Sequence, residues 1–153
     1  MLKRMNICVF MCFLFIAPVL LSAQTAAELE VVLGSSALTC SQAARFVLAS
    51  VGSDASAEND ATAFESAMNR GWLPRKAAAD DPISLGALSF LIMQSFGLKG
   101  GMMYAIFPGP RYAFRSMVSR SFIQGAADPA MTVGGERFLL ILGNVLNAAG
   151  GEE

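Results

Sequence analysis

The feature that most constrains this fold is an internal repeat. The stretch DDPISLGALSFLIMQ, which begins at Asp80, returns some fifty residues later as DPAMTVGGERFLLIL, which begins at Asp128. Each copy has a proline after an acidic residue, then a hydroxyl residue, small residues, and a phenylalanine followed by aliphatic residues. In repeat proteins each copy forms one supersecondary unit, and neighbouring units share a core. We therefore expect equivalent units packed together.

The similarity extends upstream of these stretches, over residues 61–97 and 111–146. It aligns if the loop of the second copy is two residues shorter than that of the first. A partial copy lies at residues 37–52, and the segment before it is too short for a further helix and loop. We therefore predict two full repeats and one truncated N-terminal repeat. The aligned pairs include Arg70 with Arg120, Trp72 with Phe122, Ser84 with Thr132, and Phe90 with Phe138.

Each unit has the pattern of a helix, a loop and a second helix. Phe64, Ala67, Met68 and Trp72 recur at spacings of three and four, which predicts one apolar stripe on a first helix. Proline and aspartate fill the loops that follow. The predicted fold class is all-α.

Capping residues bracket the predicted second helices. A hydroxyl before an apolar helical run accepts hydrogen bonds from the free amides of the first turn, which makes Thr39, Ser84 and Thr132 the expected N-caps. Gly52 and Gly97 stand where two of these helices should end.

The second helices are apolar nearly all round, which is typical of the middle of a bundle. The alternative is a membrane span over Ile83–Leu98. That stretch has 16 residues and contains several polar side chains, so it is short for a span. The Gly- and Pro-rich linker at 98–110 is expected to tuck its apolar residues, Met102, Met103, Ile106 and Phe107, against the bundle.

The first 23 residues have the pattern of a secretory signal peptide. Lys3 and Arg4 precede an apolar stretch at 7–21, and Ala23 supplies a small residue at its end. We expect cleavage near Ala23 and export to the periplasm or cell envelope; a retained N-terminal anchor is the alternative. The remaining predicted divisions are an N-terminal segment (24–36), a repeat domain (37–147) and a flexible tail (148–153).

Composition argues against several classes of function. The chain has no His, which removes the commonest general base and a common metal ligand. Without the signal peptide it has 9 basic and 12 acidic residues, a net charge of −3, which is no footprint for nucleic acid. Cys40 would be the only remaining cysteine, either a buried thiol or one linked to a partner. Asp80 and Asp81 are best read as loop or capping residues. We expect no catalysis, no cofactor and no metal site.

The unit YAFRSMVSRSFIQGAADPAMTVGGERFLLILGNVL, which begins at Tyr112, resembles an S-layer homology (SLH) repeat. The unit at 61–97 is similar, with RGWLP at its turn and DPISLGA at its cap. The resemblance covers residues 37–147. It implies three repeats around a pseudo-threefold axis, with their second helices in a central bundle. It also implies non-covalent attachment of an exported bacterial protein to cell-wall polysaccharide.

This sequence departs from the family at the residues that bind the wall. In SLH repeats an arginine after the capping residue helps to bind an acidic, often pyruvylated, glycan. Here those positions hold Cys40, Leu85 and Val133, and none of them is cationic. The residues that remain as a substitute anionic-glycan site are Arg70, Trp72, Arg111, Arg115, Arg120 and Arg137.

Each of these residues also has an ordinary structural interpretation: solvated arginines on helix faces, and a tryptophan packed in the core. The expected function is a non-catalytic module that binds or scaffolds envelope polysaccharide. The alternative is an interaction subunit for an envelope protein that keeps the fold and has lost glycan binding. An oligomer in which the truncated unit takes a helix from another subunit also stays open.

Overall fold

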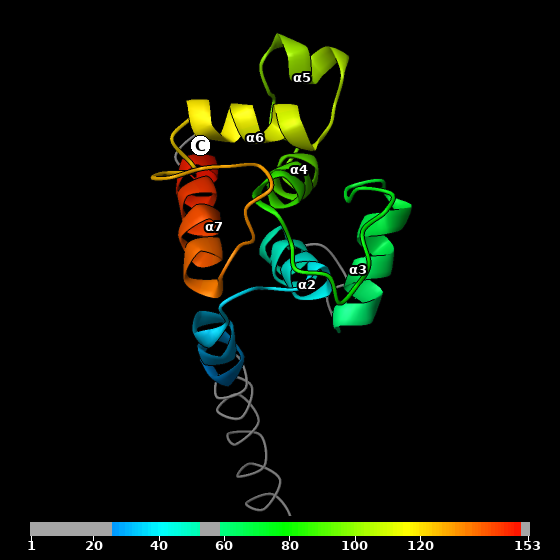
Figure 1. Cartoon of the computed structure of the whole chain (residues 1–153), viewed down its shortest axis with the longest axis vertical. Helices are drawn as coiled ribbons and strands as arrows, with labels where there is room; N and C mark the ends of the chain where they lie inside the picture. The colour runs from blue at the N-terminus through cyan, green and yellow to red at the C-terminus, as the bar shows by residue number, and fades with distance from the viewer. Residues whose placement is uncertain (1–25, 53–58, 151–153) are drawn as a thin grey trace, which may run out of the picture. The chain divides into compact units, whose positions relative to one another are not determined.

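A computed structural model describes residues 26–52 and 59–150, so the predicted signal peptide at 1–23 lies outside the described residues. The regular elements within these two ranges are all helices, which confirms the all-α prediction (Figure 1). The chain divides into two compact units, 1–34 and 35–153. In the first unit, residues 26–34 form a helix.

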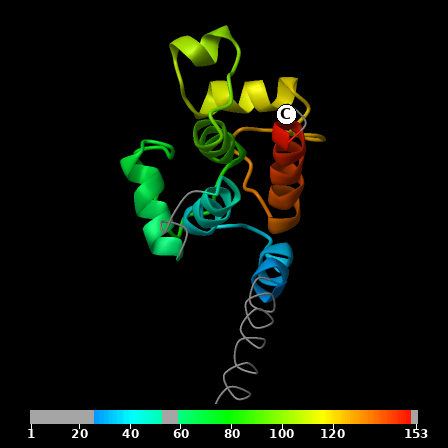
Figure 2. The ribbon, with the colours of Figure 1, turned by 180° about the vertical axis from the view of Figure 1, so that it is seen from behind.

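The second unit holds the remaining helices. α3 packs on α2 and α6 packs on α4 (Figures 1 and 2). α7 is helical through residue 150 and so includes the first residues of the predicted tail at 148–153, whose last three residues lie outside the described residues. α5 lies within the segment that was predicted to be a linker. The bounds are Cys40–Ser50 for α2, Asp60–Asn69 for α3, Leu85–Ser95 for α4, Met102–Ile106 for α5, Pro110–Ser119 for α6 and Gly135–Gly150 for α7.

Three short segments that precede α2, α4 and α7 close into a ring of backbone hydrogen bonds. The N–H of Leu38 donates to the carbonyl of Val133 (2.8 Å), that of Val133 to Ile83 (3.1 Å), and that of Ile83 back to Leu38 (2.8 Å). All three side chains are fully buried. Each segment donates to one neighbour and accepts from the other, so the three have the same place in the ring.

The ring also satisfies the first free amide of each helix that leaves it. Such amides have no partner inside their own helix and need an acceptor elsewhere. Here each bonds to a carbonyl of another ring segment, so the ring and the helix starts stabilise one another. The pairs are Cys40 N–H with Asp81 (2.9 Å), Leu85 N–H with Met131 (2.8 Å), and Gly135 N–H with Ser35 (2.8 Å).

Side-chain caps complete the starts of α2 and α4. The Thr39 hydroxyl accepts from the Gln42 N–H at 3.2 Å, and the Gln42 side chain accepts from the Thr39 N–H, which makes a capping box. The Ser84 hydroxyl accepts from the Ala87 N–H at 3.2 Å.

Thr132 does not cap α7, so this prediction was wrong. α7 begins two residues later than the cap requires, and the carbonyl that accepts the first helical bond, from Phe138 N–H, belongs to Gly134 (2.9 Å). Thr132 instead forms an isolated β-bridge with Ser84. The physical reason is the length of the loop, which is not shortened in the second copy. Ile83 and Val133 make the same ring bonds and stand 133 − 83 = 50 residues apart, the same spacing as Arg70 and Arg120.

The corrected register changes which core residues correspond. If the predicted copies are aligned at this spacing of fifty, Phe138 is paired with Leu88 rather than with Phe90, and both Phe138 and Leu88 are buried. Phe90 is also buried, but its counterpart Leu140 is 57% exposed. The Phe138 ring meets the edge of Phe46 from α2, with centroids 6.2 Å apart. In the ranges that the structure describes, no helix is both long and apolar enough to cross a membrane.

Among the described residues, four helices are followed, two residues after their last residue, by one in the left-handed region of backbone conformation. Gly52 and Gly97 follow α2 and α4, as predicted, and Gly71 follows α3 (φ 71°). After α6 the corresponding residue is Ser121 (φ 61°), whose Cβ makes this conformation sterically unfavourable.

Ser121→Gly is therefore expected to raise the free energy of unfolding by about 0.5–1 kcal/mol, because glycine adopts this conformation without strain. Ser121→Ala is the matched control, since alanine keeps the Cβ. Urea unfolding of both variants measures the difference. Equal stabilities of the two variants would contradict the assignment of strain to this residue.

Candidate functional site

The six residues predicted to bind a ligand do not form one site. Arg70 and Trp72 lie together at the end of α3, with the guanidinium carbon 4.8 Å from the indole centroid. Arg70 is exposed and Trp72 is half-buried. The two side chains form a cation–π pair, so the arginine covers one face of the indole.

Arg120 and Arg137 are engaged with loop carbonyls. Arg120 donates to the carbonyl of Lys99. Arg137 donates to the carbonyls of Ala126 (2.6 Å) and Gln124 (3.3 Å). These contacts give both side chains a part in fixing the loops around α6 and α7.

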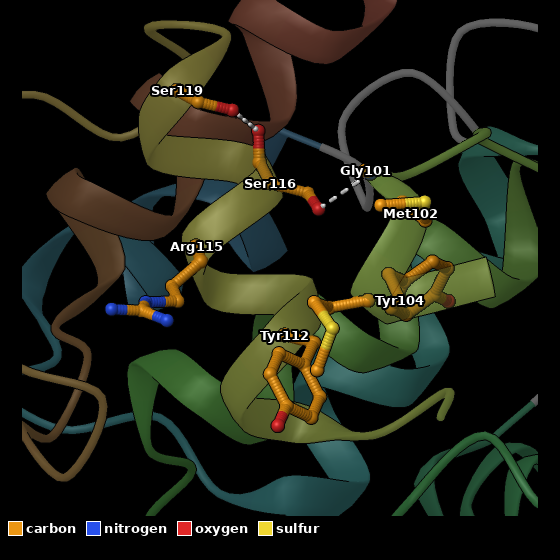
Figure 3. A pocket seen from close by; sticks show the side chains of 8 residues that line it. Gly101, Met102, Tyr104, Tyr112, Arg115, Ser116 and Ser119 are labelled. Carbon is orange, nitrogen blue, oxygen red and sulfur yellow. Dashed lines mark hydrogen bonds between the residues drawn. The ribbon is translucent and has the colours of Figure 1, made fainter. Parts of the chain in front are cut away.

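Arg115 lines an open groove of about 310 Å³ between α5 and α6, shown in Figure 3. In that view the Arg115 side chain extends from α6 away from Tyr104. Arg111 lies one turn earlier on α6 and is exposed, as is Arg115. Of the predicted residues, Arg115 thus lines this groove, and Arg111 lies one turn from it on α6. The lining residues are Gly101, Met102, Met103, Tyr104, Tyr112, Arg115, Ser116 and Ser119.

Hydrogen bonds hold the walls of this groove together. The buried Ser116 hydroxyl accepts from the Gly101 N–H at 3.3 Å, which joins α6 to the start of α5. The Gln94 side-chain amide donates to the Tyr104 hydroxyl at 2.8 Å, which joins α4 to α5. Burial raises the pKa of Tyr104, while the hydrogen bond from Gln94 lowers it. The phenol is therefore neutral at physiological pH.

Tyr112 and Ser119 were not among the predicted site residues. The signal was their spacing, because residues 112, 115, 116 and 119 recur at three and four and lie on one face of a helix. These serine and tyrosine residues belong to no sequence motif, so only the neighbouring arginines were predicted to bind a ligand.

The prediction that four apolar residues of the linker pack against the bundle was wrong. Met102, Met103, Ile106 and Phe107 are 77, 47, 59 and 62% exposed. Only Tyr104 of this segment turns inward, at 8%. The reason is geometric: a five-residue helix held at Tyr104 presents too short a face to bury the other side chains.

Cysteine and aspartate, residue types that act as nucleophiles or metal ligands, have structural surroundings here. Cys40 is buried, and burial together with the negative charge of Asp81 raises its thiol pKa to about 11. Such a thiol is protonated at neutral pH and is a poor nucleophile. The Asp81 carboxylate accepts from the Ala78 N–H at 3.2 Å, a turn contact. Within the part of the chain that the structure describes, no three His, Cys, Asp or Glu side chains gather to hold a metal ion.

The residues that directly follow the three capping positions are also affected by the corrected register. The first residues of α2, α4 and α7 are Cys40, Leu85 and Gly135, so the third position is Gly135 and not Val133. All three are buried and none is cationic.

No protein-family model matches this chain, and no curated protein or solved structure matches it significantly.

Proposed function

We propose that this protein is an exported, non-catalytic binding module of the cell envelope that associates with acidic wall or envelope polysaccharide. In this proposal three helix–loop–helix units, the first truncated, form an SLH-like arrangement around a pseudo-threefold axis. The closed ring of Leu38, Ile83 and Val133 supports it, because the three segments share one bonding pattern. The signal-like sequence of residues 1–23 supports export.

The observation that carries the proposed function is the chemistry of the groove on α6. Tyr112 offers an aromatic side chain, Ser119 a hydroxyl, and Arg115 an exposed guanidinium. An arginine fork pairs with a sugar carboxylate through two hydrogen bonds, and an aromatic side chain packs against the apolar face of a sugar ring. Tyr112 and Ser119, with the exposed Arg115 beside them on α6, thus offer the kinds of group that an acidic saccharide requires.

A pull-down on isolated wall sacculi tests the proposal. Arg111→Gln combined with Arg115→Gln is expected to lower the bound fraction at least about tenfold, because charge-assisted hydrogen bonds are lost. Added salt should weaken binding of the unmodified chain in the same direction. Arg75→Gln, at an exposed arginine in the loop between α3 and α4, is the matched control and should bind as the unmodified chain does. Equal binding by the double variant and the control would dismiss the groove as the glycan site.

A second candidate is an interaction subunit for another envelope protein, without glycan binding. The observation that favours it is the absence of a cation at the starts of α2, α4 and α7. Failure to sediment with sacculi, together with co-purification of one envelope protein, would favour this candidate over the first.

A further inference from the structure

The α5 segment holds four large apolar side chains in contact with solvent. Met102, Met103, Ile106 and Phe107 are each about half exposed or more. Tyr104 anchors the same short helix through its hydrogen bond with Gln94. Figures 1 and 2 show α5 beyond α6, on the side away from α4. The four apolar side chains thus lie on a projecting tip, and contiguous exposed apolar groups of this kind mark interaction surfaces.

The charge around this tip is of one sign. Residues 82–127 contain four basic residues and neither Asp nor Glu, a net charge of +4, whereas the whole chain carries −1. Lys99 lies three residues before α5 and is exposed; Arg111 and Arg115 follow on α6 and are exposed too. An apolar tip with a basic border is complementary to a surface that is anionic outside and apolar beneath.

We propose that the α5 tip docks on a bilayer that contains anionic phospholipid. Met102, Met103, Ile106 and Phe107 insert into the boundary between headgroups and acyl chains. Lys99, Arg111 and Arg115 lie at the level of the lipid phosphates. Shallow insertion of apolar side chains and attraction of basic ones to anionic lipid are the two contributions that hold interfacial segments on membranes. This inference is independent of glycan binding and does not require it.

A bilayer fits this tip better than a protein partner does. A specific protein interface buries about 800 Å² on each partner and needs complementary shape over that area. Four side chains on a five-residue helix and the residue that follows it offer only a small apolar surface. A bilayer accepts a convex apolar tip without a preformed pocket, and its anionic headgroups match the basic border.

Fluorescence quenching by lipids brominated on the acyl chain tests the inference at α5 itself. The full chain carries Phe107→Trp in a Trp72→Phe background, which leaves one indole; Phe122 occupies the position equivalent to Trp72. Vesicles contain brominated phosphatidylcholine with or without phosphatidylglycerol. We expect at least about twofold quenching with phosphatidylglycerol present and little without it. Leu140→Trp in the same background is the matched control, because Leu140 is 57% exposed on α7. The readout is local, so insertion of residues 1–23 into the vesicles does not mimic it.

A charge variant supplies the second arm. Lys99→Gln and Arg111→Gln are each expected to weaken binding to the anionic vesicles about fivefold. Quenching that is absent at position 107, or equal at positions 107 and 140, would overturn the inference. So would equal quenching with neutral and anionic vesicles. Capture of a protein through the α5 side chains without quenching would assign the tip to that protein instead.

The membrane proposal and the glycan proposal can be contradicted by different results. Phe107→Ser should abolish vesicle docking and leave sedimentation with sacculi unchanged. Loss of sacculus binding with intact quenching would dismiss the glycan proposal alone.

Discussion

Phe138→Ala is expected to lower the free energy of unfolding by about 3–5 kcal/mol, the cost of truncating a buried phenylalanine. Phe138 is 0% exposed and lies where α7 meets α2, with its ring 6.2 Å from that of Phe46 at an interplanar angle of 63°. Truncation removes the edge-to-face contact and leaves a cavity between two helices that both start from the ring. Urea denaturation followed by far-ultraviolet circular dichroism measures the loss.

Leu140→Ala is the matched control on the same helix. Because Leu140 is 57% exposed, its truncation should cost less than about 1 kcal/mol. The pair also tests the register of α7, since a shift of two residues along the helix would exchange a core position for a surface one. A cost at Leu140 as large as that at Phe138 would contradict the orientation of α7.

The helices could be predicted from the sequence because the signals that define them are local. Apolar spacing of three and four acts within a turn, and a cap such as Thr39 or Ser84 acts on an amide three residues away. The left-handed residues at Gly52 and Gly97 are equally local. The register of the last repeat could not be predicted in this way. Gly134 has no side chain that could accept a hydrogen bond, so it does not indicate a helix start in the sequence. The position of α7 is fixed by bonds to residues near Leu38, about a hundred positions away.

The candidate site was predictable only in part, for the same reason. Arg111 and Arg115 were predicted to bind a ligand, and Arg115 does line a groove. Arg120 and Arg137 were singled out equally, yet they bond to loop carbonyls 21 and 11 residues away. A side chain that bonds across a loop does so at no regular separation in the sequence, so spacing does not predict such contacts. The exposure of the apolar residues in the α5 segment could not be predicted either. Hydropathy indicates that a side chain prefers burial, but not whether a surface is present to cover it.

Gly134→Ala is expected to lower the free energy of unfolding by about 1–3 kcal/mol. A Cβ at this position would stand 3.0 Å from the carbonyl oxygen of Ser36 and 3.3 Å from that of Ser35. Both contacts are backbone atoms, so no side-chain rotation relieves them. The Ser35 carbonyl also accepts from the Gly135 N–H, so moving this segment away lengthens the bond that joins it to α7.

Gly143→Ala, inside α7, is expected to have the opposite effect, a gain of about 0.5–1 kcal/mol. No atom lies within 4 Å of a Cβ there, and alanine is the better helix former in a helix interior. The two variants make the same chemical change, one directly before α7 and one inside it, so their opposite signs separate the packing of the ring from helix propensity. A gain at both positions in urea denaturation would mean that residues 35–36 do not close on the start of α7. The ring would then have two joined segments instead of three, and the start of α7 would lose its bond to the segment that precedes α2.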